Sequence, residues 1–277
     1  MKLIQKIILI LVICLTITKY AASQHTWYIG LHFNPGTYQL YNKNDWNADP
    51  TLIYPVTGKL NSWTVGPTVT YIWSNHFGVS SGLLYQHCKQ EFLAKKDPND
   101  PDPLVFYSIT DEFNYLKLPI NFEYSTNNEA KHQFVASFGL QTSFLMDYRE
   151  HFLQKSTGFY SENEIHNKIS KDIDNTNNPD GTYSSFIYKR LLLGMNSKVG
   201  YRFKFNDGWL FEIGIKGDYY LTNAENRKAK FIPNNNADFW ASGIKRYGYG
   251  GSIDTRPKTH NRTWGIYIST SIPISVR

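Results

Sequence analysis

The sequence predicts an all-β protein, an eight-stranded antiparallel transmembrane β-barrel with short periplasmic turns and long extracellular loops. Three observations predict it. Apolar and polar residues alternate with a period of two in eight separate segments of the chain. The connections between these segments are alternately long and short. After the N-terminal leader, no apolar run reaches the roughly 18 to 20 residues that a membrane-spanning helix needs.

The first residues predict export from the cytoplasm. Lys2 and Lys6 flank an apolar run, and Ala21-Ala22-Ser23 supplies small residues for cleavage. Residues 1–23 are therefore predicted to be a cleaved signal peptide, and residues 24–277 the barrel domain. Removing Lys2, Lys6 and Lys19 with the leader leaves 26 basic side chains against 23 acidic ones, so no nucleic-acid partner is expected.

Four segments are expected in the first half of the mature chain. They run from about Thr26 to Tyr41, from Trp63 to Ser74, from Phe77 to about Phe92, and from Asn114 to Ser125. A tight turn joins the second to the third. The Asp- and Pro-rich stretch KKDPNDPDP separates the third from the fourth. Cys88, on the interior-facing parity of the third segment, is the one cysteine after cleavage, so no intramolecular disulfide is predicted.

Four more segments are expected in the second half. The fifth follows the short polar turn STNNEAKH and places Phe134, Phe138, Leu140, Phe144, Met146 and Tyr148 on one face. A polar gap of roughly 35 residues precedes the sixth, from about Ser185 to Phe205. The seventh covers Trp209 to Leu221. After a gap near 40 residues, the last segment alternates Trp264, Ile266 and Ile268 with small residues and Tyr267.

Turn geometry predicts which side chains face each other. If Asn206-Asp207-Gly208 forms a three-residue hairpin loop with Gly208 in the left-handed region, Phe203 opposes Phe211 and Arg202 opposes Glu212. A one-residue slip would move every side chain to the other face. The same loop length at residues 74–76 places Tyr71 opposite Val79.

These registers place apolar side chains on one face and polar ones on the other. The apolar faces carry aromatic residues near their ends and aliphatic residues between, as lipid-facing barrel walls do. In the fourth segment, Leu116 to Tyr124 are predicted to face lipid, while Lys117 and Glu123 face the interior. Pro119 lacks a ladder donor, so a local irregularity is expected there. A soluble lipocalin-like barrel would require the Trp and Phe faces to point inward.

The fourth segment also resembles a known family. Tyr115, Leu116, Leu118, Pro119 and Ile120 match the strand pattern Y-L-x-[IL]-P-[IL] of the PorT-like outer-membrane β-barrel family of Bacteroidetes-type bacteria. Phe138-Gly139-Leu140 is similar to the next strand of that family. The resemblance implies a location in the bacterial outer membrane and a role as an accessory part of a larger envelope complex. The chain ends in Arg277, whereas outer-membrane barrels often end on an aromatic residue.

The predicted interior contains seven charged side chains. An eight-stranded barrel is just wide enough for side chains to fill it, and buried charges must be paired. We therefore expect an ion-pair network, with the two glutamates and Arg202 near the periplasmic end and the three lysines and Asp218 nearer the middle. Its members are Lys117, Glu123, Lys198, Arg202, Glu212, Lys216 and Asp218. Lys198 opposite Lys216 would repel unless a carboxylate lies between them.

The last long loop is the candidate partner-binding loop. It interleaves aromatic side chains with basic ones, the residue types that anchor protein interfaces. Its candidate residues are Phe231, Phe239, Trp240, Lys245, Arg246, Tyr247 and Tyr249. The expected partners are outer-membrane lipid and a protein of an envelope complex. The same aromatic residues could instead cover the mouth of the barrel.

The main hypothesis is a non-enzymatic outer-membrane protein that acts as an accessory or partner-binding subunit, without cofactor or metal. The second hypothesis is a narrow pore or a small-ligand receptor at the barrel mouth. The third is an outer-leaflet lipid-modifying enzyme, with His151, His166 or His260 as base and Ser156 or Ser161 as partner. The eight histidines show no paired metal-ligand spacing.

Overall fold

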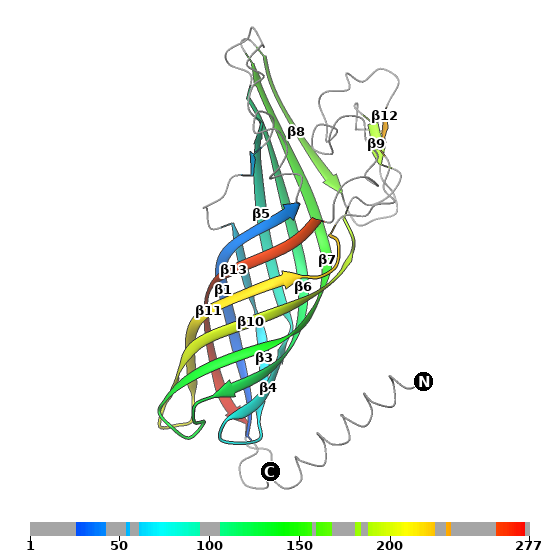
Figure 1. Cartoon of the computed structure of the whole chain (residues 1–277). Coiled ribbons are helices and arrows are strands. Elements are labelled where there is room, and N and C mark those ends of the chain that lie inside the picture. Colours follow the sequence, from blue (N-terminus) through cyan, green and yellow to red (C-terminus); the bar gives the residue numbers. More distant parts are fainter. Residues whose placement is uncertain are drawn as a thin grey trace, which may run out of the picture.

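The computed structural model contains one ring of antiparallel strands (Figure 1). It describes residues 26–42, 54–55, 61–94, 106–156, 159–167, 181–183, 188–224, 231–233 and 259–274. The predicted signal peptide lies outside these ranges. Within them, no helix is long and apolar enough to cross a membrane.

Eight strands close the ring in the described chain, as the sequence predicts, when β4 (Phe77–Gly82) and β5 (Leu84–Ala94) are counted together as one interrupted strand. They are β1 (Thr26–Asn42), β3 (Ser62–Ile72), β4 with β5, β6 (Phe106–Ser125), β7 (His132–Ser156), β10 (Leu191–Lys204), β11 (Leu210–Tyr220) and β13 (Thr259–Ile274). Each of these strands pairs with the ones before and after it, and β13 pairs with β1, so the ring has no unpaired edge strand. Closure satisfies the backbone groups that lipid cannot satisfy.

The two predicted hairpin registers are confirmed. Phe203 pairs with Phe211 and Arg202 with Glu212, and Gly208 has a φ of 84°, the left-handed conformation that the turn requires. In the other hairpin, Tyr71 pairs with Val79. The three short turns therefore lie at one end of the ring, which we call the short-turn end. The long connections lie at the opposite, long-loop end.

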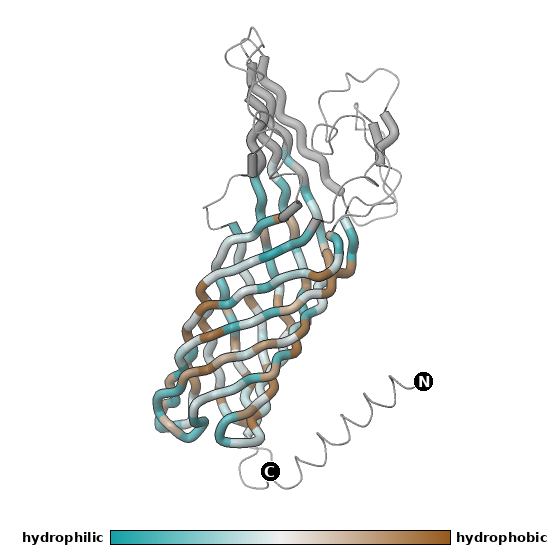
Figure 2. Tube along the Cα trace, viewed as in Figure 1, coloured by the Kyte–Doolittle hydropathy of each residue, from teal (hydrophilic) through white to brown (hydrophobic). Residues whose placement is uncertain are grey.

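Side chains alternate between the two faces of the wall along most strands. The outward face carries the large apolar residues, and Leu140, Val199 and Ile215 are each more than 60% exposed. Hydrophobic residues recur at intervals along the strands of the ring (Figure 2). The interior instead holds buried charges, amides and hydroxyls. The apolar faces thus point outward, which excludes the soluble lipocalin-like alternative.

The β6–β7 pairing differs from the sequence prediction at two positions. The pairing of β6 with β7 shifts by one residue between Asn114 and Tyr115, where Met146 is the extra residue of β7. This bulge reverses the facing beyond it, so Tyr148 is buried in the interior and the prediction that it shares the outer face with Met146 was wrong. At Pro119, the β6–β7 ladder is continuous, and Pro119 pairs with Gln141.

The irregularity expected at Pro119 lies in the neighbouring strand, where β4 ends and β5 begins. Ser81 pairs with Ile120 and Leu84 with Lys117, so the break between β4 and β5 lies beside Pro119. A proline cannot donate a hydrogen bond to its neighbour. The hydroxyl of Ser81 instead donates to the carbonyl of Pro119 at 2.8 Å. The third segment is therefore two strands, whereas the sequence predicts one.

Several strands continue beyond the ring at the long-loop end. The β6–β7 pairing reaches Phe106 and Lys155, and β8 (Phe159–Asn167) adds to β7. On the other side, β5 follows β6 as far as Ala94, and β2 (Tyr54–Pro55) pairs with β5. We call the part of β5–β8 beyond the ring the upper sheet (Figure 1). The predicted polar gap before the sixth segment thus contains β8, and β7 is longer than expected.

A separate small pairing joins two of the long connections. The strands β9 (Gly181–Tyr183) and β12 (Phe231–Pro233) form a two-stranded sheet. Phe231 of the candidate partner-binding loop begins β12 and pairs through its backbone with Tyr183. The other residues proposed for that loop lie outside the described ranges: Phe239, Trp240, Lys245, Arg246, Tyr247 and Tyr249.

Candidate functional site

Four of the predicted interior charges form one compact group near the short-turn end. Arg202 of β10 contacts Glu123 of β6 through Nη2, and its Nε and Nη2 donate to Oε2 of Glu212 at 2.9 and 2.6 Å. The Nζ of Lys198 lies 3.2 Å from Glu123 and 2.9 Å from Glu212. We call Glu123, Lys198, Arg202 and Glu212 the charge quartet. Its two cations and two anions cancel.

The quartet gains a hydrogen bond from an aromatic side chain that sequence reasoning did not assign to it. The hydroxyl of Tyr267, on β13, donates to Oε1 of Glu212 at 2.6 Å. The ring of Tyr267 covers Gly200 and Gly214, where an added Cβ would lie 2.2 and 2.9 Å from tyrosine atoms. The interior parity of all three residues was readable from the sequence, and two facing glycines are a signal that a large ring fills the space.

A second ion pair joins Lys117 and Asp218, apart from the charge quartet. Lys117 of β6 donates to Asp218 of β11 across the interior, and the hydroxyl of Thr263 donates to the same carboxylate at 3.0 Å. Both charged side chains are almost fully buried. The pairing joins strands that are not neighbours in the ring, so strand register alone did not predict it.

The two opposed lysines separate into these two groups. Lys198 and Lys216 are register partners, and Lys198 belongs to the charge quartet. The expectation that Lys198 lies with Asp218 nearer the middle is therefore corrected. Lys216 has Asp218 as its ion-pair partner in the described chain, at 3.8 Å, which is longer than a hydrogen bond.

Toward the long-loop end, aromatic and aliphatic side chains fill the interior. Phe113 is fully buried and contacts the rings of Tyr38, Tyr115, Tyr148 and Tyr188. Together with Leu40, Cys88, Leu145, Leu192, Tyr220 and Ala224, they form the apolar plug. The thiol of Cys88 is buried there. The plug obstructs the axis of the barrel above the charges.

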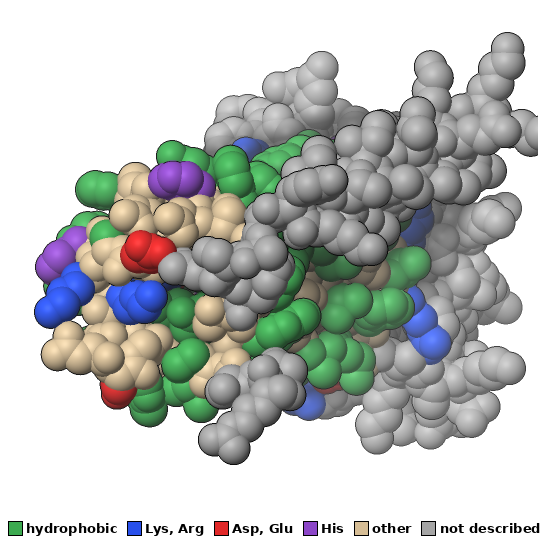
Figure 3. All heavy atoms as spheres, turned by 90° about the horizontal axis from the view of Figure 1, so that it is seen from below, with side chains coloured by type: hydrophobic (Ala, Val, Ile, Leu, Met, Phe, Trp, Pro, Cys, Tyr) green, Lys and Arg blue, Asp and Glu red, His purple; other side chains and the backbone are tan. Residues whose placement is uncertain are grey.

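A smaller apolar cluster lies near the short-turn end. Tyr28, Ile72 and Leu210 are buried against one another from three strands. Seen from this end, charged and histidine side chains gather at the described turns, and hydrophobic side chains lie along the flanks (Figure 3). The charged interior is thus bounded by apolar side chains on both sides.

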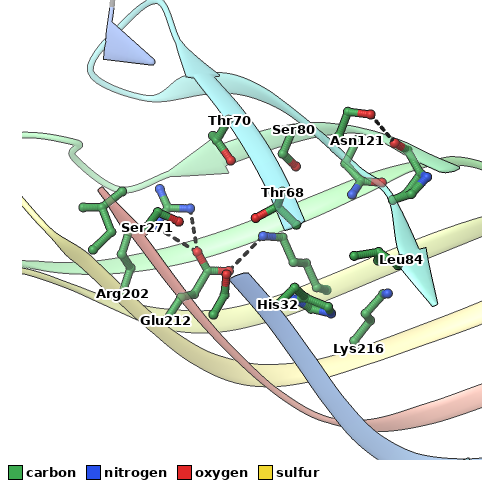
Figure 4. A pocket seen from close by; sticks show the side chains of 15 residues that line it. His32, Thr68, Thr70, Ser80, Leu84, Asn121, Arg202, Glu212, Lys216 and Ser271 are labelled. Atoms are coloured by element: carbon green, nitrogen blue, oxygen red, sulfur yellow. Dashed lines mark hydrogen bonds and ion pairs between the residues drawn. The ribbon is translucent and has the colours of Figure 1, made fainter. Parts of the chain in front are cut away.

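Between the charge quartet and the opposite wall lies a polar cavity of about 40 Å³ (Figure 4). Lys198, Arg202, Glu212 and Lys216 line one side. Ser and Thr side chains of β3 and β4 line the other, and serines of β13 lie on the strand next to β11. Such a volume holds about three water molecules. Sequence reasoning missed this cavity, because it arises where long side chains do not reach the small residues across the ring.

The described outward face of the upper sheet is charged. Lys89 pairs with Glu112 at 3.2 Å, and Arg149 with Asp147 at 3.2 Å. His151 lies 3.9 Å from Glu112. Charges on an outward face require water, so the lipid-facing band ends below these residues.

The histidine candidates for catalysis do not converge in the described chain. The Nδ1–H of His260 donates to the carbonyl of Tyr220 at 2.9 Å, while His151 lies 3.9 Å from Glu112. For His166, Ser156 and Ser161 the structure describes the backbone strands β7 and β8 alone. Among the described residues, no group of His, Cys, Asp or Glu is arranged to hold a metal ion.

Several solved bacterial structures are similar to this chain at low sequence identity. OprG from Pseudomonas aeruginosa is 9% identical, covers 92% of this chain and 97% of its own, and has a TM-score of 0.43. Ail of Yersinia pestis is 9% identical, with coverages of 91% and 100% and a TM-score of 0.36. Neisserial surface protein A is 7% identical, with coverages of 89% and 98% and a TM-score of 0.36.

A comparison with curated protein sequences found no match. A family model does match, over most of the chain. The model of the outer membrane protein beta-barrel domain covers residues 21–224. This match agrees with the closed ring, the apolar outer wall and the polar interior, and it places the chain in the bacterial outer membrane. The chain belongs to the outer membrane protein beta-barrel domain family.

Proposed function

We propose that this protein is a non-enzymatic accessory subunit of an envelope complex, and that it binds a protein partner outside the membrane through the upper sheet and the adjoining loops. The observation that carries the proposal is the upper sheet itself. From Asn114 to Phe106, β6 extends about 26 Å beyond the residues that face lipid. Anchoring in the bilayer needs the lipid-facing band alone, so this extension supports a role in the extracellular space.

The edge of the upper sheet supports binding of another chain. β8 is the last strand in the sheet order, with β7 as its one partner in the described chain. An open edge offers backbone donors and acceptors to an added strand, a common mode of protein recognition. The ion pairs on the described outward face reduce non-specific association of that face.

The packed interior favours this proposal over a pore. The apolar plug and the paired charges occupy the axis, which leaves little space for a continuous water path. The proposal is non-enzymatic because six of the seven charges of the interior network lie in close ion pairs, and the thiol of Cys88 is buried in the plug. We also propose cleavage of residues 1–23 and the finer PorT-like relationship, which residues 115–120 support.

Site-specific photocrosslinking in native membranes tests the proposed surface. A photoreactive residue replaces Glu112 on the outward face of the upper sheet, and a matched one replaces Lys131 in a short periplasmic turn. We expect a crosslinked protein of fixed mass from position 112 and none of that mass from position 131. Mild-detergent purification of a tagged chain should recover the same protein in fixed proportion.

Failure of both measurements would contradict the proposal. If neither position gives a crosslink and the barrel purifies alone, the subunit role is lost. Ion conductance in planar bilayers then tests the pore. Channel steps that survive substitution in the upper sheet would favour the pore.

A further inference from the structure

We propose that the polar cavity in the lower half of the barrel binds one small monovalent anion of chloride size. The first argument is charge. The charge quartet is neutral, and Lys117 with Asp218 is neutral. Lys216 is then the one cation of the seven-residue network without a carboxylate of its own. It is 4% exposed and lines the cavity.

An unbalanced charge in a protein interior is costly. Removing an ammonium group from water costs several kcal/mol, which a partner of opposite charge offsets. Asp218 gives incomplete compensation: its Oδ1 lies 3.8 Å from Lys216 Nζ, beyond hydrogen-bond distance, while its Oδ2 accepts from Lys117 and Thr263. A single negative charge in the cavity would balance Lys216, whereas a divalent anion would leave an excess in the other direction.

The second argument is the supply of donors. His32 Nε2 and Arg202 Nη1 are buried and have no hydrogen-bond partner in the described chain, and both side chains line the cavity. His32 is 6% exposed and Arg202 is 3% exposed. Arg202 Nη1 is always a donor, and His32 Nε2 is a donor in the tautomer that carries the proton there. Buried donors are rarely left unpaired. Asn121, with Oδ1 also unpaired, can present its amide nitrogen when the side-chain amide is rotated.

The opposite wall adds neutral donors. Thr68 and Thr70 of β3 and Ser80 of β4 face the cationic side chains across the cavity (Figure 4), and Ser271 of β13, the neighbour of β11, also lines it. Hydroxyl groups donate to anions without adding charge. The combination of a lysine, a guanidinium nitrogen and hydroxyl donors is the chemistry of a small anion site.

Glu212 is the one carboxylate in the cavity wall, and it does not oppose anion binding strongly. Its two oxygens accept from Lys198, Arg202 and Tyr267. These contacts neutralise it and orient it toward its donors. The cavity of about 40 Å³ holds about three water molecules, or one chloride with fewer waters, and excludes an anion as large as gluconate.

Unfolding in mixed salts tests the site. The full mature chain is refolded into detergent in sodium chloride, sodium gluconate or mixtures of constant ionic strength. The thermal unfolding midpoint is followed by tryptophan fluorescence. We expect the midpoint to rise by about 3 to 5 °C for each tenfold increase in chloride above its dissociation constant. Lys216→Met should remove this dependence.

The control is Lys204→Met, because Lys204 lies on β10 outside the cavity wall and donates to the carbonyl of Asn128. It should retain the chloride dependence of the unchanged protein. A second measurement uses bromide, which gives an anomalous diffraction signal. Crystals of the unchanged protein grown in bromide should show a peak within hydrogen-bond distance of Lys216 Nζ.

Two results would overturn the proposal. One is an unfolding midpoint that does not depend on chloride, or a dependence that is equal in Lys216→Met and in the control. The other is a bromide-grown crystal with no anomalous peak in the cavity. If Lys216→Met does not refold, Thr70→Val replaces it, and the expected result is a weaker chloride dependence.

Discussion

Replacing Arg202 by methionine should destabilise the barrel by breaking the charge quartet. Methionine fills part of the space of the arginine stem but leaves Glu123 and Glu212 with Lys198 as their one shared cation. The quartet then carries a net charge of −1 inside the barrel. Glu212 also loses the two hydrogen bonds that Arg202 Nε and Nη2 donate to it.

The size of the effect follows from burial. Arg202, Glu123 and Glu212 are each at least 95% buried at the side chain. Removing one partner of a buried ion pair typically costs about 3 to 5 kcal/mol, because the remaining charge keeps its desolvation penalty. The outward pair of Arg149 with Asp147 has side chains 46% and 32% exposed. Breaking such a surface pair costs about 0 to 1 kcal/mol.

Urea unfolding in phospholipid vesicles, followed by tryptophan fluorescence, measures the difference. We expect Arg202→Met to lose about 3 to 5 kcal/mol of unfolding free energy, and the control Arg149→Met at most about 1 kcal/mol. Adding Glu123→Gln to Arg202→Met restores neutrality and should recover more than half of the loss. Equal costs for Arg202→Met and Arg149→Met would refute the reasoning, because they would show that the quartet is solvated like a surface pair.

Three further predictions concern single positions. Tyr267→Phe should cost about 1.5 to 3 kcal/mol in the same unfolding assay, because Glu212 loses a buried charged hydrogen bond. Gly208→Ala should cost about 1 kcal/mol, since φ is 84° there and an added Cβ would also lie 3.1 Å from Pro273; no measurable loss would contradict a left-handed turn. Ile215→Lys should cost about 2 to 4 kcal/mol in vesicles, because that side chain is 65% exposed on the lipid-facing wall. Thr110→Lys, on the outward parity of the upper sheet, should cost little by comparison.

Much of the fold was predictable because a barrel is built from local rules. The two-residue period fixes the facing of each segment, and a three-residue turn with Gly208 fixes the register of β10 with β11. These rules do not predict where an extra residue forms a bulge. The bulge at Met146 was not predictable, because Tyr148 is apolar enough for either face and its burial depends on contact with Phe113 and Tyr188.

The charged interior was predictable in membership but not in pairing. Parity places Glu123, Arg202 and Glu212 in the interior, and register makes Arg202 face Glu212. Contacts across the ring depend on strand tilt and side-chain length, which no local pattern encodes. For this reason Lys198 was expected near Asp218, whereas it joins Glu123 and Glu212.

The sequence by itself determined that this chain forms a closed membrane barrel, since only paired strands with one apolar face satisfy every backbone group in lipid. It also determined which side chains enter the interior, since facing follows from parity. The tertiary structure decided where those side chains meet. It placed Lys216 3.8 Å from Asp218, left a cavity beside it, and continued β6 and β7 beyond the ring. These features depend on distances across the ring, which are determined jointly by residues that lie far apart in the chain.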